Sequence, residues 1–250
     1  MKTFNLLTSL MHSIYIAEND LRQSFKSVRH VVWSLLFPIF MMLTFGFRES
    51  VSGLAISSLV PGIVGMTAMF GSINETMSIV WDKSLGVFDR ILAAPVSSTS
   101  IIVGKTIAGA VMGVISALVL LIIGSSLFGV SFVNIGFALV IVVLASFSFT
   151  GIGTIISGLA SEPREAMMLS NLLRFPMMFL GGVFFDVNLM PSPLPLVARA
   201  LPLTYATEGL KAAAVSGDLG VVLFDAIVLV AYMVGTIIVG SKILMKLMTR

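Results

Sequence analysis

Gly104-Lys105-Thr106 matches the end of a phosphate-binding loop, in which backbone N–H groups and a lysine hold the phosphates of a nucleotide. The full motif needs another glycine five positions before Gly104, where this chain has Thr99. It also needs a preceding strand, which no nearby pattern predicts. We therefore interpret Lys105 as an interfacial lysine at the start of a helix, and we expect that this chain does not bind ATP by itself.

Other catalytic and metal-binding patterns are missing from the sequence. The two histidines, His12 and His30, both lie in the N-terminal segment, so they cannot pair with a serine in the long apolar segments that follow. The sequence has no cysteine, no Gly-x-Ser-x-Gly motif and no His/Asp/Glu group with the spacing of metal ligands. We expect no enzyme activity, disulfide, metal site or cofactor bound by this chain.

Two charged residues, Glu75 and Arg174, lie at the edge of or within long apolar segments. Charges inside a membrane are costly and therefore mark candidate functional positions. Glu75 follows an apolar segment, and its favoured interpretation is a solvated or paired carboxylate near the inner interface. Arg174 would lie about 13 Å along a helix that starts near Glu165, and it should face a polar interior or a carboxylate. Glu75 is one candidate partner.

The composition indicates that these residues belong to a membrane protein. Of 250 residues, 57% are hydrophobic and only 11% are charged, whereas a soluble domain has about 25% charged residues. The apolar runs suit helices of about 20 residues, and the alternating segments of a transmembrane barrel are not found. The net charge of +3 fits basic loops on the inner side. We therefore expect a lipid bilayer and no nucleic acid as partner.

Six membrane-spanning helices are predicted in a single domain that covers residues 1–250. The spans are Val31–Phe47, Leu54–Ile73, Thr106–Phe128, Ile135–Ala160, Ala166–Phe185 and Val221–Ser241. Gly109, Gly113 and Ala117 share one face of the third span, which favours close helix packing. The fold class is thus an all-α integral membrane protein.

Residues 1–30 form a predicted amphipathic helix outside the spans. Apolar residues such as Leu7, Met11 and Ile14 recur at three- and four-residue steps, while Arg22 and Lys26 lie off that stripe. This pattern is typical of a helix that lies in the cytoplasmic interface of a membrane. The alternative is a short soluble helix that packs on the rest of the protein.

The distribution of Lys and Arg predicts the orientation. If the N-terminus is inside, eleven lie in inner segments and three, Arg48, Arg199 and Lys211, in outer segments, with Arg174 inside a span. Both termini are therefore predicted to be cytoplasmic, with a C-terminal tail after the sixth span in 221–250. Two connections are long, namely an inner loop over 81–105 and an outer, proline-rich segment over 186–220.

The inner loop contains a predicted amphipathic helix. Leu85, Phe88 and Ile91 form an apolar face at helical spacing, charged residues such as Asp89 surround it, and Pro95 ends the helix. Such a helix can lie on lipid or dock into a groove on another protein. The residues alone leave both uses open.

Three stretches together resemble the type-2 permeases of ATP-binding cassette (ABC) exporters, close to the daunorubicin-resistance and Nod-factor or polysaccharide export groups. They are Pro61-Gly62 with 81–96, residues 176–185, and residues 201–211. The chain departs from the family pattern at Gly181-Gly182, where Ser-Gly is usual, at Asp186, where proline is usual, and at Arg174, where an apolar residue is usual.

The resemblance implies roles for particular residues. Residues 1–30 would be the connecting helix, and residues from Pro191 to Val215 would form short re-entrant helices in the outer leaflet. A coupling helix would be seated in the ATPase, with Asp89 and Arg90 fixing its register; it comprises Leu85, Gly86, Val87, Phe88, Asp89, Arg90 and Ile91. The outer gate and re-entrant segment would include Gly181, Gly182, Phe184, Pro202 and Tyr205.

The resemblance also implies an assembly in the plasma membrane. Two separate ATPase subunits would bind ATP and Mg²⁺, and a second permease subunit, identical or homologous, would complete the exporter. The cargo would be an amphiphilic drug, a lipid or a lipid-linked glycan that moves outward. The alternative function is an ion-coupled secondary transporter, which needs carboxylates near the membrane midplane. Here only Glu75 comes close, and it lies towards the inner face.

Overall fold

The structure, a computed structural model, describes residues 6–26, 28–46, 56–86 and 97–248. Within these ranges all regular secondary structure is helical. The elements are α1 Leu6–Lys26, α2 Val28–Gly46, α4 Ile56–Thr76, α5 Ser78–Ser84, α7 Ser98–Phe128, α8 Ile135–Leu159, α9 Pro163–Leu180, η1 Val187–Leu189, α10 Leu194–Ala198, α11 Pro202–Lys211, η2 Ala212–Ser216 and α12 Leu219–Met248.

Four stretches of the described chain are long and apolar enough to cross a membrane. They are Ile56–Ser84, Thr99–Phe128, Ile135–Leu159 and Leu219–Lys246. The predicted all-helical class is therefore confirmed. The other two predicted spans correspond to α2 and α9; α2 contributes a shorter apolar stretch, Leu35–Gly46, and α9 contains Arg164, Glu165 and Arg174. The count of six spans remains a prediction.

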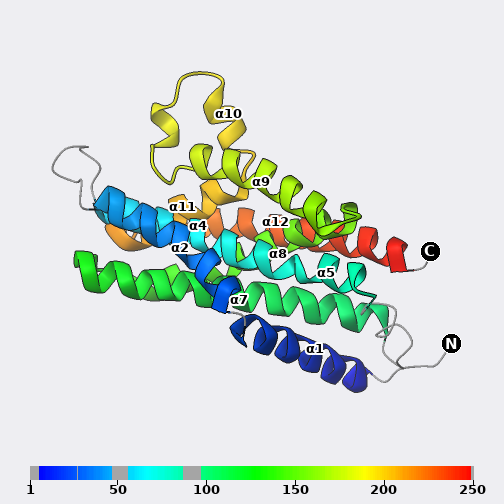
Figure 1. Cartoon of the computed structure of the whole chain (residues 1–250). Helices are drawn as coiled ribbons and strands as arrows, with labels where there is room; N and C mark the ends of the chain where they lie inside the picture. The colour runs from blue at the N-terminus through cyan, green and yellow to red at the C-terminus, as the bar shows by residue number, and fades with distance from the viewer. Residues whose placement is uncertain (1–5, 27, 47–55, 87–96, 249–250) are drawn as a thin grey trace.

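α4 is the central helix of the bundle, and α2, α7, α8 and α11 pack around it (Figure 1). It is buried along nearly its whole length. Small residues on α7 permit this close packing, as the sequence predicted. A Cβ added at Gly113 would lie 3.0 Å from the Ala68 carbonyl oxygen on α4, and one at Gly109 would lie 2.8 Å from the Thr150 methyl group on α8.

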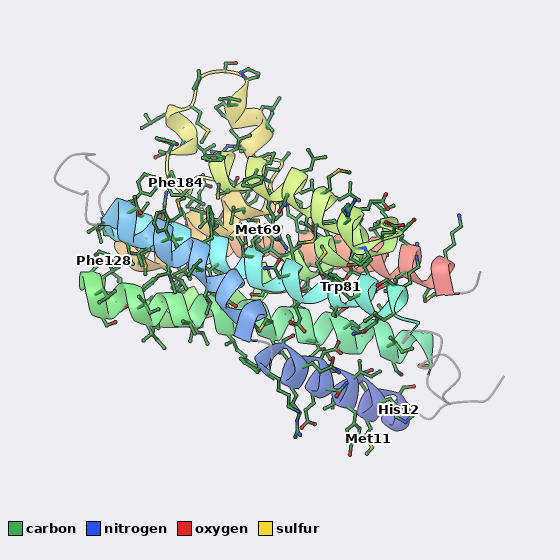
Figure 2. The ribbon with its side chains drawn as sticks, in the orientation of Figure 1. Met11, His12, Met69, Trp81, Phe128 and Phe184 are labelled. Carbon is green, nitrogen blue, oxygen red and sulfur yellow. The ribbon has the colours of Figure 1, made fainter. Side chains whose placement is uncertain are left out.

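α1 lies along the outside of the bundle against α7 (Figure 1). Its buried face is small and polar and includes Ser13, Ala17 and Asp20. The predicted apolar stripe, with Met11 and Ile14, is exposed, and Met11 projects away from the bundle in Figure 2. α1 therefore packs on α7 through its small polar face. Its apolar face remains exposed, which is the arrangement expected of a helix in a membrane interface.

Several helices run beyond their predicted ends. α4 continues to Thr76, and α5 prolongs it to Ser84 after a single turn residue, so the predicted inner loop begins as helix. α7 begins at Ser98 because the Ser97 hydroxyl accepts a hydrogen bond from the Ser100 N–H at 3.1 Å, which caps the helix. Lys105 is thus one and a half to two turns inside α7, which corrects its interpretation as a residue at a helix start.

Candidate functional site

A cluster of three charged residues in the described part of the chain centres on Lys105. Its ammonium lies 2.6 Å from Asp82 Oδ2 on α5 and 2.8 Å from Asp20 Oδ2 on α1. The bond to Asp82 has hydrogen-bond geometry, whereas the contact with Asp20 is an ion pair without that directionality. We call these three residues the Lys105 junction. It ties together α1, α5 and α7, three elements that are distant in the sequence.

The Lys105 junction is buried, since the Lys105 side chain is only 3% exposed. Burial raises the pKa of the Asp20 carboxyl, and the attraction of the Lys105 ammonium opposes this shift. A buried ion pair adds little net stability when intact, but removal of one partner leaves an uncompensated charge. The junction therefore holds three helices in one arrangement, and removal of one of its charged side chains is expected to destabilise the fold.

Gly104 and Ser24 complete the attachment of α1. A Cβ at Gly104 would lie 2.7 Å from the Ser13 carbonyl oxygen and 2.9 Å from Ile16 Cβ, so only glycine permits this approach of α1 to α7. The Ser24 hydroxyl donates a hydrogen bond of 2.7 Å to Glu75 Oε2 on α4. Gly104-Lys105, which resembles part of a nucleotide-binding motif, instead forms the contact between α7 and α1.

The predicted coupling helix lies mostly outside the described residues. Of its members, Leu85 and Gly86 are described, at the end of α5, and Val87, Phe88, Asp89, Arg90 and Ile91 are not. Leu85 is 69% exposed, and Gly86 has a positive φ of 66°, which ends the helix. Asp82 and Lys105 therefore join the two chain segments that enter and leave 87–96.

The predicted gate residues lie at the opposite end of the bundle, around α11. Gly181 and Gly182 end α9, and Gly182 has a positive φ of 75°. The Phe184 ring packs on Phe45 of α2, with ring centroids 5.1 Å apart, and Figure 2 shows it beside α2 and α4. Pro202 is the first residue of α11, and the Tyr205 hydroxyl donates a hydrogen bond of 2.7 Å to the Arg199 carbonyl.

The segment over 186–220 contains the short helices η1, α10, α11 and η2. The resemblance implied short re-entrant helices from Pro191 to Val215, and their re-entry into the membrane remains a prediction. The Thr204 hydroxyl bonds the Ala198 carbonyl at 2.5 Å, and the Tyr232 hydroxyl of α12 bonds the Ala200 carbonyl at 2.8 Å. These bonds fix the α10–α11 turn against α12.

Arg174 is buried within α9, with 6% of its surface exposed. Its guanidinium carbon lies 5.2 Å from the centre of the Phe70 ring on α4, a cation–π contact. Nε and Nη2 have no hydrogen-bond partner. The suggested pair with Glu75 is not among the ion pairs of the described residues, because Glu75, 1% exposed, is directed to Ser24 of α1.

Metal coordination finds no support within the described ranges. No three His, Asp or Glu side chains there gather closely enough to hold an ion.

The Lys105 junction could not be predicted from the sequence, because Asp20, Asp82 and Lys105 share no local spacing. The one signal in the sequence is a lysine directly before a long apolar segment, because a lysine that becomes buried there requires a partner.

The comparisons with known proteins agree with this architecture. A family model described as "ABC-2 type transporter" matches residues 14–215. Nodulation protein J of Rhizobium meliloti is 25% identical over 62% of this chain and 60% of its own length. The linearmycin resistance permease protein LnrN of Bacillus subtilis is 25% identical over 65% of this chain and 42% of its own.

ABC transporter G family member 20 of Dictyostelium discoideum is 29% identical over 62% of this chain and 22% of its own length. The chain spans less than two thirds of the length of the curated relatives it matches.

Proposed function

Because the chain belongs to the ABC-2 type transporter family, we propose that it is the permease subunit of an exporter driven by a separate ABC ATPase. Two ATPase subunits bind ATP and Mg²⁺, and a second permease subunit, identical or homologous, completes the assembly. The cargo is an amphiphilic drug, lipid or lipid-linked glycan that moves outward across the plasma membrane.

In the proposed topology α2, α4 with α5, α7, α8, α9 and α12 cross the membrane, with both termini in the cytoplasm. At 1.5 Å per residue, the 18 residues of α9 span about 27 Å, close to the thickness of the hydrocarbon core. α1 lies in the inner interface as the connecting helix, with its exposed apolar face towards lipid. α10 and α11 enter the outer leaflet and return.

The Lys105 junction is the observation that best supports coupling at the inner face. Asp82 precedes and Lys105 follows the loop proposed to contact the ATPase, and Asp20 adds α1 to the same junction. A displacement of the loop would therefore move α1, α5 and α7 together. ATP binding to the ATPases would bias the permease between two packed arrangements, as a ligand biases any two-state equilibrium.

Co-purification tests this proposal. Leu85→Asp, directly before the turn at Gly86, and Phe88→Asp, after it, each place a carboxylate on an apolar position of the proposed coupling segment, and they should abolish co-purification of the ATPase while the permease still inserts. Leu189→Asp is the matched control, because Leu189 is also an exposed leucine and lies in η1, outside the proposed coupling segment. ATPase recovery and transport equal to the wild type in the Leu85 and Phe88 variants would refute the coupling assignment.

The ion-coupled alternative makes a different prediction. A secondary transporter would move its cargo in liposomes with an ion gradient and without any ATPase. ATP-dependent transport that is indifferent to the gradient would reject it.

A further inference from the structure

A cavity of about 450 Å³ opens beside α11 at the end of the bundle opposite the Lys105 junction. Its charged and polar wall is formed by Asp186, Asn188, Arg199, Glu208 and Lys211, and we call it the α11 pocket. Its volume is within the range of small-molecule sites in proteins, about 300–1,000 Å³.

The α11 pocket lies at a membrane boundary. Ser58 and Val221 line it, and each is near the first residue of a candidate span, Ile56–Ser84 or Leu219–Lys246. Val215, another lining residue, is 52% exposed. The pocket therefore combines a charged wall with an apolar rim at the level where the polar and apolar parts of a lipid meet.

The cations of the α11 pocket lack close anionic partners. The Lys211 ammonium donates one hydrogen bond, of 2.6 Å, to the Gly182 carbonyl, and no carboxylate of the described chain pairs with it. Arg199 Nη2 donates to Asn188 Oδ1 at 3.2 Å, and its Nη1 lies 4.0 Å from Glu208 Oε2, the outer limit of an ion pair. Both cations keep donors for a ligand.

The pocket carries carboxylates as well as cations. Asp186 Oδ1 accepts hydrogen bonds from Asn188, and Glu208 is only weakly paired with Arg199. Burial raises the pKa of the Glu208 carboxyl and lowers the pKa of the Lys211 ammonium, as expected where charges are poorly hydrated. The wall thus offers two cations and two acids to one ligand.

The backbone around Lys211 is irregular in a way that shapes this wall. The π-helix η2, Ala212–Ser216, follows α11 directly and ends at Gly217, whose φ is 65°. π-helices are rare and occur often at functional sites. Here η2 contributes Val215 and Ser216 to the pocket lining.

We propose that the α11 pocket binds the zwitterionic headgroup of a phospho-amine amphiphile. The phosphate lies between Lys211 and Arg199, where charge-assisted hydrogen bonds are strongest. The ammonium lies against Asp186 and Glu208, and the apolar tail leaves over Val215. A purely anionic headgroup would meet two uncompensated carboxylates. The choice of an amphiphile rests on the proposed export function.

Native mass spectrometry of the full-length chain in a maltoside detergent tests the proposal without ATPase or nucleotide. The probes are lysophosphatidylethanolamine, lysophosphatidylglycerol and an alkyl trimethylammonium of equal chain length. We expect lysophosphatidylethanolamine to bind most tightly. Lys211→Met should weaken its binding about ten-fold or more, because one hydrogen bond to a charged group is lost. Arg199→Gln, at a half-exposed side chain, should also weaken binding, and Lys242→Met on α12 is the unaffected control.

Equal binding of the three probes, or wild-type affinity in a folded Lys211→Met or Arg199→Gln variant, would overturn the proposal. Transport measured in the complex with the ATPase shows whether the bound headgroup belongs to cargo or to a resident bilayer lipid. A parallel loss of lysophosphatidylethanolamine transport assigns the pocket to cargo, and unchanged transport assigns it to a resident bilayer lipid. Because binding is measured without the ATPase, a failure of the export function would leave this result intact.

Discussion

Lys105→Met is the sharpest perturbation of the Lys105 junction. It removes the ammonium that lies 2.8 Å from Asp20 and 2.6 Å from Asp82, and it leaves the buried Asp20 and the partly buried Asp82 without a cation. Loss of one partner of a buried ion pair costs about 3–5 kcal/mol of unfolding free energy. For a chain of this size, each kcal/mol lowers Tm by about 2–4 °C, which gives an expected decrease of about 6–20 °C.

The assay is the fraction of full-length protein that stays monodisperse in size-exclusion chromatography after heating in detergent. Lys83→Met, at an exposed lysine of the same helix as Asp82, is the matched control and should leave Tm unchanged. The triple variant with Asp20→Asn and Asp82→Asn should recover much of the loss, because no buried charge remains unpaired. A Tm within about 1 °C of the wild type for Lys105→Met would refute this reasoning.

Three further perturbations test other parts of the molecule. Gly104→Ala should lower the unfolding free energy by about 1–3 kcal/mol and make α1 accessible to protease, because its Cβ would meet the Ser13 backbone. Gly235→Ala, in open space on α12, is the control and should have neither effect. Equal behaviour of the two variants would contradict the account. Arg174→Leu should raise Tm, because it removes a buried cation whose Nε and Nη2 have no hydrogen-bond partner, and it should reduce transport; unchanged transport would reject a functional role. The pKa of Glu208 is raised by burial, so its contribution to stability is present below pH 4.5 and is lost as pH rises through its folded-state pKa. Glu208→Gln should therefore flatten the Tm-against-pH profile above pH 4.5, and a profile parallel to the wild type would contradict this assignment.

The sequence predicted the helices well where apolar periodicity was long. The spans at Thr106–Phe128 and Ile135–Ala160 correspond to α7 and α8, and the small-residue face of α7 packs as expected. Their ends were less predictable. α7 starts eight residues earlier than its apolar run, at Ser98, because a local serine cap rather than hydropathy sets that end.

The candidate sites were predicted only in part. Glu75 and Arg174 stood out as charges among apolar residues, but their partners, Ser24 and Phe70, depend on how α1 and α9 dock on α4. Local patterns do not contain that information. The Lys105 junction likewise depends on tertiary contacts between residues that are tens of positions apart. The sequence around Lys105 resembles part of a nucleotide-binding motif and gives no indication of this packing role.

The departure from the family pattern lies at Gly181, where serine is usual, and close packing accounts for it: a Cβ at Gly181 would lie 2.9 Å from Leu203 Cγ on α11. Gly182, where the family also has glycine, adopts a positive φ of 75°, and its carbonyl accepts the hydrogen bond from Lys211. This turn thereby positions one wall of the α11 pocket.

Reconstitution into liposomes is the most direct test of the claim that this chain transmits force from a separate motor. The purified permease is inserted with and without its ABC ATPase, and transport of a fluorescent amphiphile is followed after addition of ATP and Mg²⁺. The account predicts transport only when both proteins and hydrolysable ATP are present. Movement of the amphiphile by the permease alone, at a rate that ATP and the ATPase do not change, would contradict it.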